Sequence, residues 1–147
     1  MKAEPFVVTP ETYADPLNVI GARITALATA SQTQGYEITL QEGEEGIGPP
    51  PHYHDWDESF FILEGSVNLT CGDQAVSCGP GSLVHVPGGT VHSFQFGAGG
   101  GKMLEITSKG GNAINAFTAI SKEIPPGSPD VEGVIEVFGA NGVRIHF

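Results

Sequence analysis

The sequence predicts one all-β domain, a small barrel of short strands followed by short C-terminal helices. The chain has 21 glycines and 11 prolines spread along it, while the hydrophobic fraction of 39% is ordinary. That combination is typical of many strands joined by tight turns. At 147 residues the chain is long enough to bury one core of its own. Apolar residues alternate at period two as far as Ser108 and recur at helical spacing beyond it.

The barrel core is expected over residues 21–108, after an N-terminal arm over residues 1–16 in which Phe6–Val8 form a possible edge strand. Its strands are predicted at residues 21–30, 36–42, 59–63, 66–71, 75–78, 82–86, 91–96 and 102–107. A loop is expected over residues 43–51, and Gly97–Gly101 is interpreted as a glycine-rich turn.

A two-residue turn at Gly72-Asp73 is predicted to join the strands on either side of it. This register pairs Cys71 with Gln74 and places Cys78 opposite Val67. The two cysteines then do not face each other, so the sequence disfavours a redox pair and predicts free thiols.

The C-terminal extension, residues 112–147, is predicted to contain two short helices. Ile114, Phe117 and Ile120 give the first helical pattern, over residues 112–122. The second pattern consists of Val131, Val134, Ile135 and Phe138, with Ser128-Pro129-Asp130 as its N-terminal cap. A strand over residues 134–138 is the alternative, and residues 143–147 are expected to form a closing strand. The helices are expected to pack against the outside of the barrel or against a partner subunit.

The charge of the chain excludes some functions. The net charge is −11, with 6 lysines and arginines in total, and such a surface repels the phosphate backbone of nucleic acids. No apolar run reaches the length of a membrane span. Residues 1–5 lack the apolar stretch of a signal peptide. We therefore expect a cytoplasmic protein that acts on a small molecule and binds neither nucleic acid nor membrane.

Three histidines and one glutamate suggest a metal site. His52 and His54 are two residues apart, so on a strand both side chains point to one face. Glu58 follows four residues later, and His92 begins another run at period two. Three imidazoles and a carboxylate are a ligand set that a divalent transition metal prefers, whether Fe, Mn, Ni, Co, Cu or Zn.

Two longer patterns surround these residues. Gly-x5-His-x-His-x3-Glu-x6-Gly is matched from Gly46 to Gly65, and Gly-x5-Pro-x-Gly-x2-His from Gly81 to His92. They resemble the two conserved motifs of the cupin superfamily, with Phe96 in place of the asparagine that usually ends the second. Residues 48–65 and 103–107 are similar to single-domain cupins related to quercetin 2,3-dioxygenase. The resemblance implies a jelly-roll barrel, also called a double-stranded β-helix, with one metal ion held by these four residues.

The resemblance also implies chemistry on a small aromatic or enolic substrate, such as a flavonol, catechol or diketone, in a dioxygenase reaction. Glu58 is a candidate base toward a substrate hydroxyl. Phe60, Ile62, Phe94 and Phe96 are candidate pocket walls as well as core. A metal-dependent isomerase, epimerase or lyase, or a binding protein without turnover, remains open. Family habit and the apolar arm favour a homodimer.

Four other residues are weaker candidates for the functional site. His85 lies between two valines of a strand and is expected to point outward, and His146 is expected to be structural. Trp56 is either a pocket rim or a partly buried surface residue. Asp57 is expected to be solvated, with a contact to a histidine N–H as the alternative.

Overall fold

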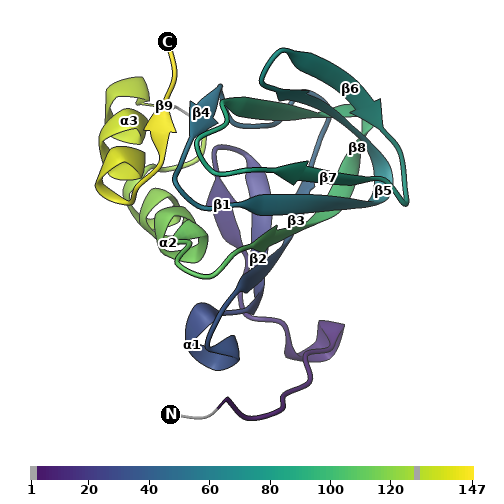
Figure 1. Ribbon diagram of the computed structural model, residues 1–147, viewed down its shortest axis with the longest axis vertical. Helices are drawn as coiled ribbons and strands as arrows, with labels where there is room; N and C mark the ends of the chain where they lie inside the picture. Colours follow the sequence, from purple (N-terminus) through teal and green to yellow (C-terminus); the bar gives the residue numbers. More distant parts are fainter. Residues whose placement is uncertain (1–2, 128–129) are drawn as a thin grey trace.

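The computed structural model describes residues 3–127 and 130–147, and these form a curled antiparallel sheet with helices on one side (Figure 1). The elements in chain order are η1 (Pro10–Thr12), β1 (Leu17–Val19), β2 (Ala22–Ala28), α1 (Ala30–Thr33), β3 (Glu37–Gly43), β4 (His52–Tyr53), β5 (Glu58–Cys71), β6 (Gln74–Cys78), β7 (Leu83–Val86), β8 (His92–Thr107), α2 (Ala113–Glu123), α3 (Val131–Ala140) and β9 (Arg144–Ile145). The all-β class with C-terminal helices is confirmed.

The two long strands β5 and β8 hold the barrel together. They pair with each other along most of their length, from Glu58 opposite Thr107 to Cys71 opposite His92. On one side the sheet continues as β8–β3–β2–β1, and on the other β5 pairs with β6 and β7. One core cluster fills the interior between these strands; its largest fully buried members are Phe60, Ile62, Leu69, Phe96 and Met103.

The prediction of a turn at Gly97–Gly101 is wrong, because β8 runs through these five residues without ending. Gly101 pairs with both Gly43 and Gly65, and the register shifts next to this pair. A Cβ atom on Gly101 would lie 2.8 Å from the carbonyl oxygen of Ser66 and 2.9 Å from the ring of Phe96. Glycine is therefore present because the strand bends and neighbouring backbone comes close.

The N-terminal arm differs from its expected form. Phe6–Val8 have no strand partner, and the strand that does form is β1, which pairs with β2. The hairpin prediction, by contrast, is confirmed residue by residue: Cys71 pairs with Gln74, and Cys78 lies opposite Val67. Both cysteines are free thiols.

Both C-terminal helices are confirmed as α2 and α3, and β9 falls inside the expected closing strand. Asp130 caps α3 by accepting a hydrogen bond from the backbone N–H of Gly133 at 3.1 Å. Ser128 and Pro129, the rest of the predicted cap, lie outside the described residues. The strand alternative for residues 134–138 is wrong.

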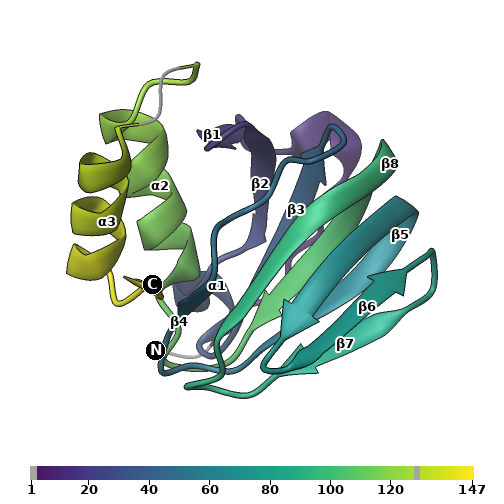
Figure 2. The ribbon, with the colours of Figure 1, turned by 90° about the horizontal axis from the view of Figure 1, so that it is seen from above.

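Of the two expected positions of the helices, the outside of the barrel is wrong, and packing against a partner subunit stays a prediction. They cover the open side of the curled sheet, as Figure 2 shows. Ala116 and Ile120 of α2 and Phe138 of α3 pack in one buried cluster with Ala22 and Ile24 of β2. Since Ile24 also lines the internal cavity described below, α2 and α3 form the cover of that cavity.

Candidate metal centre

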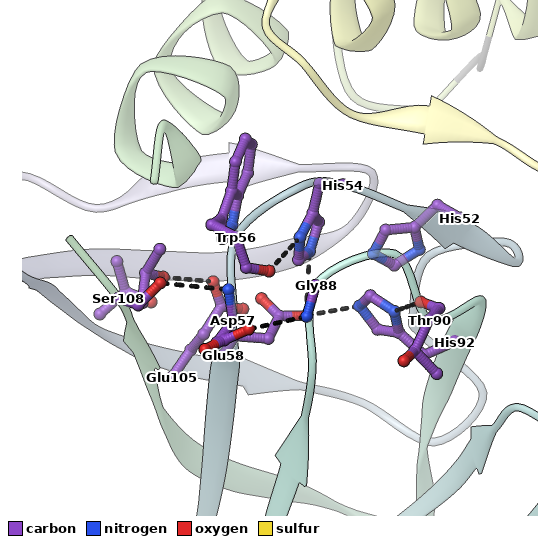
Figure 3. A network of polar contacts seen from close by, with 12 residues as sticks. His52, His54, Trp56, Asp57, Glu58, Gly88, Thr90, His92, Glu105 and Ser108 are labelled. Carbon is purple, nitrogen blue, oxygen red and sulfur yellow. Dashed lines mark hydrogen bonds and ion pairs between the residues drawn. The ribbon is translucent and has the colours of Figure 1, made fainter. Parts of the chain in front are cut away.

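The four candidate ligands come from three strands that meet at one end of the barrel. His52 lies on β4 directly opposite His92, the first residue of β8. Glu58 begins β5, and His54 lies in the short connection before it. One donor atom from each of the four residues lies within 4.8 Å of the others (Figure 3). The two motifs, whose histidines are 38 and 40 residues apart in the sequence, therefore converge as a single cluster.

Each histidine ring is fixed by a backbone carbonyl. Nδ1 of His52 donates to the oxygen of Pro50 at 2.8 Å, Nδ1 of His54 to that of Trp56 at 2.9 Å, and Nδ1 of His92 to that of Thr90 at 2.8 Å. Because a carbonyl oxygen can only accept, the proton of the neutral ring is on Nδ1. The lone pair is then on Nε2 in all three rings, which is the state in which an imidazole binds a metal.

Glu58 lies between two of these Nε2 atoms. Its Oε1 is 3.2 Å from Nε2 of His54 and is also in contact with Nε2 of His92. Burial opposes the charged carboxylate, but the hydrogen bonds and charges of His54 and His92 outweigh it and lower the pKa of Glu58 to about 2. Glu58 is therefore an anion at neutral pH.

The histidines respond to the same surroundings. Burial, together with repulsion from His92, lowers the pKa of His52 to about 4, so this ring is neutral. Burial also acts against a charge on His92, but the hydrogen bond and charge of Glu58 outweigh it and raise the pKa of His92.

The chemistry of this donor set fits a divalent cation. Nε2 of His92 is fully buried and lies directly against the Glu58 carboxylate. A lone pair facing a carboxylate is unfavourable, and a positive charge between them removes the conflict. A divalent metal ion held by all four residues would supply that charge.

Trp56 lies behind the cluster and stacks on His54, with ring centroids 4.3 Å apart and planes 6° from parallel. It is buried against α2, α3 and β2 and lines the cavity described below, so it belongs to the pocket wall and not to the surface. Asp57 is exposed and accepts a hydrogen bond at 2.8 Å from the N–H of Gly88, not from a histidine. These contacts fix the 54–58 connection that carries two of the ligands.

A narrow cavity leads from the cluster to the helices. Its volume is about 60 Å³, counted as the space open to the centre of a water-sized sphere. The metal end is lined by His52, His54 and Glu58, and the far end by apolar side chains of β1, β2, α2 and α3. Phe60 and Phe94 line this cavity, whereas Ile62 and Phe96 lie buried in the barrel core beyond it. No lysine or arginine lines the cavity among the residues that the structure describes.

Two polar residues in the cavity wall were not found by sequence reasoning, Gln41 on β3 and Glu105 on β8. Nε2 of Gln41 donates to Oε2 of Glu105 at 2.7 Å. Burial, followed by the charge of the neighbouring Glu58, raises the pKa of Glu105 well above its usual value. One signal was present in the sequence, because Glu105 is two residues from Met103 and therefore shares its strand face.

The two remaining histidines lie away from the cluster. His85 is exposed on β7, as expected, and its Nδ1 is 2.9 Å from Oγ of Ser59. His146 is exposed near the end of the chain. Across residues 3–127 and 130–147, no helix has the length and apolar character needed to cross a membrane.

Comparison with known proteins agrees with this architecture. Residues 36–107 match the family described as the cupin domain (Cupin_2). Quercetin 2,3-dioxygenase of Bacillus subtilis (strain 168) is 33% identical over 86 residues, which are 57% of this chain and 26% of that protein. The chain thus spans about a quarter of the length of this relative.

Solved structures show the same fold. KdgF from Halomonas sp. superposes with a TM-score of 0.67 at 17% identity, covering 76% of this chain and 99% of that one. The polyketide cyclase RemF from Streptomyces resistomycificus gives a TM-score of 0.61 at 21% identity, with 71% and 80% covered. The chain therefore has the cupin fold, and residues 36–107 match the cupin domain family. The chain resembles the single-domain cupins related to quercetin 2,3-dioxygenase.

Proposed function

We propose that this cupin is a metal-dependent dioxygenase that acts on a small, uncharged substrate with two neighbouring oxygens, such as a catechol or an enolised diketone. The observation that carries the proposal is the convergence of three imidazole Nε2 atoms and one carboxylate at the end of an apolar cavity. The partial likeness to a protein named quercetin 2,3-dioxygenase supports dioxygen as the second substrate.

His52, His54, Glu58 and His92 would hold one divalent ion of Fe, Mn, Ni, Co, Cu or Zn. The bound ion would supply positive charge that favours the deprotonated, chelating form of the substrate oxygens. The three carbonyl contacts of the histidines keep the ligand nitrogens in place without rearrangement. These carbonyl contacts therefore form the site before the ion binds.

Glu58 is the proposed base that takes the proton of the substrate hydroxyl. It is the only carboxylate among the four candidate ligands. The contacts that lower its pKa in the free protein come from His54 and His92. A bound cation lowers the pKa of a coordinating carboxylate, so Glu58 must bind the ion weakly, or be displaced from it when the substrate binds, in order to accept that proton.

The cavity supports small and neutral substrates. Its volume corresponds to roughly four to six water molecules at about 10–15 Å³ each. A single ring fits this space better than the three rings of a flavonol, which would require α2 and α3 to move apart. Without lysine or arginine in the described wall, a substrate phosphate or carboxylate would have no basic side chain to pair with.

The test combines metal content with oxygen consumption. Purified protein is analysed for bound metals, and oxygen uptake is then measured with catechols, β-diketones and flavonols. We expect one metal per chain and uptake that disappears in His92→Ala but persists in His85→Ala, the matched control outside the cluster. Metal-loaded protein that takes up no oxygen with any of these compounds would contradict the dioxygenase proposal.

A further inference from the structure

A second polar group lies in the cavity wall beside the proposed metal site. Gln41 on β3 and Glu105 on β8 line the cavity, and Thr39 and Thr107 on the same two strands are buried beside them. Thr39 and Glu105 are opposite each other in the sheet register. The proposed metal chemistry uses none of these side chains, so the burial of this polar group calls for another explanation.

The amide of Gln41 is held in one orientation. Its Nε2 donates to Oε2 of Glu105 at 2.7 Å and to Oγ1 of Thr39 at 3.3 Å. These two contacts use both N–H bonds of the amide. Within the described chain, the side-chain oxygen of Gln41 accepts no hydrogen bond. This oxygen is not fully enclosed by protein atoms, so it faces the cavity that Gln41 lines.

We propose that Gln41 is a substrate-binding residue whose side-chain oxygen accepts a hydrogen bond from a ligand hydroxyl, and that Glu105 positions the amide for this contact. The inference rests on the proposed function and deepens it by adding a requirement for the substrate. The ligand carries a hydroxyl next to its two chelating oxygens.

The position of Glu105 in the cavity wall indicates where that ligand hydroxyl would lie. Glu105 lines the same cavity as Glu58 and accepts the hydrogen bond of Gln41, so the amide lies in the cavity wall that also contains the proposed metal ligands. Other parts of the wall are apolar, including Phe60 and Phe94. A single-ring ligand can therefore chelate at the histidines, rest its ring on the apolar wall, and direct one neighbouring hydroxyl toward Gln41.

The test uses two ligands that differ by one hydroxyl, catechol and pyrogallol, under anaerobic conditions. The protein is loaded with Zn²⁺, which has no redox chemistry. Binding is followed by the fluorescence of Trp56, the single tryptophan of the chain and part of the cavity wall. We expect pyrogallol to bind roughly three- to tenfold more tightly than catechol, as one net hydrogen bond predicts.

Gln41→Met keeps the side-chain length and removes the acceptor. We expect it to abolish the preference for pyrogallol while the affinity for catechol stays within about twofold. Gln95→Met, an exposed glutamine on β8, is the matched control and should keep the full preference. A preference unchanged in Gln41→Met would overturn the inference and leave the proposed function intact.

Glu105→Gln provides a second variant, which is needed if Gln41→Met does not fold. A glutamine at position 105 can donate as well as accept, so it no longer forces one orientation on Gln41, and the preference should fall below half of its wild-type value. An unchanged preference would refute the positioning role of Glu105. If neither ligand binds the wild-type zinc protein, both the inference and the proposed chelating site are wrong.

Discussion

A metal ion at the four-residue cluster should raise the melting temperature of the protein, and replacing one ligand should remove most of this gain. An ion that binds the folded state alone stabilises it by RT ln(1 + [L]/Kd), about 2.7 kcal/mol when its concentration is 100 times Kd. The cluster forms only in the folded chain, because its ligands come from β4, β5, β8 and a connecting segment.

The size of the shift follows from chain length. An unfolding entropy of about 2.1 cal/mol/K per residue gives about 0.3 kcal/mol/K for 147 residues, so 2.7 kcal/mol corresponds to about 9 °C. His92→Ala removes one of three imidazoles. Residues that only hydrogen-bond to a metal ligand typically contribute up to about 100-fold in metal affinity. If the loss of His92 lowers the affinity by about 100-fold, the same metal concentration raises the melting temperature by only about 1 °C.

The assay is calorimetry of protein treated with a chelator and then titrated with each candidate ion. His85→Ala is the control, since this exposed histidine lies outside the cluster and should leave the shift near 9 °C. Equal shifts in His92→Ala and His85→Ala would refute the assignment of His92 as a ligand. No shift with any ion in the wild type would refute the metal site itself.

Five further outcomes are expected. Glu58→Gln should retain metal yet lose turnover by about 10²–10⁴ in steady-state rate, and unchanged turnover would refute its role as a base. In metal-free protein the pKa of His52 is lower in the folded state, so between pH 6.5 and about 4 the unfolded chain binds more protons than the folded chain. The urea concentration at the unfolding midpoint should therefore decrease as the pH is lowered from 6.5 to about 4, and it should decrease less steeply in His52→Gln. The lowered pKa of Glu58 should add a loss from pH 4.5 toward about 2, absent in Glu58→Gln. Ile120→Ala, at a fully buried site under the cavity cover, should lower the unfolding free energy by about 2–5 kcal/mol in urea titrations. A homodimer formed through the arm and outer strands should give about twice 15.3 kDa by light scattering, and a mass near 15 kDa would contradict it.

The strands and the convergence of the four ligands could be predicted because both depend on local rules. Period-two alternation located the strands, and the turn at Gly72-Asp73 fixed the hairpin register to the residue. Spacing put His52 and His54 on one strand face, and the motif resemblance connected them to His92. Glycine was less informative, because it marks turns and close backbone contacts alike, as Gly97–Gly101 shows.

The cavity could not be predicted, because it depends on which surfaces the helices cover. Alternation showed that Leu40 and Gln41 are on opposite faces of β3, but both are buried at 7% and 1% exposure, so neither face could be assigned to the interior. The need for glycine at position 88 could not be predicted either, because it depends on a contact with a distant part of the backbone. Gly88 lies inside the second motif without being part of it, yet a Cβ there would be 2.3 Å from the carbonyl oxygen of Asp55.

The pairing of β9 with β4 makes the end of the chain part of the candidate site. Ile145 is opposite His52, Arg144 is opposite Tyr53, and the N–H of His146 donates to the oxygen of Pro51 at 2.8 Å. The region that matches the cupin family stops at residue 107, so a fragment cut to that region would keep all four ligands but lose a strand that holds one of them in register. The smallest unit that can be expressed, transplanted or redesigned as a metal site therefore includes the C-terminal segment, and an affinity tag is better placed at the N-terminus.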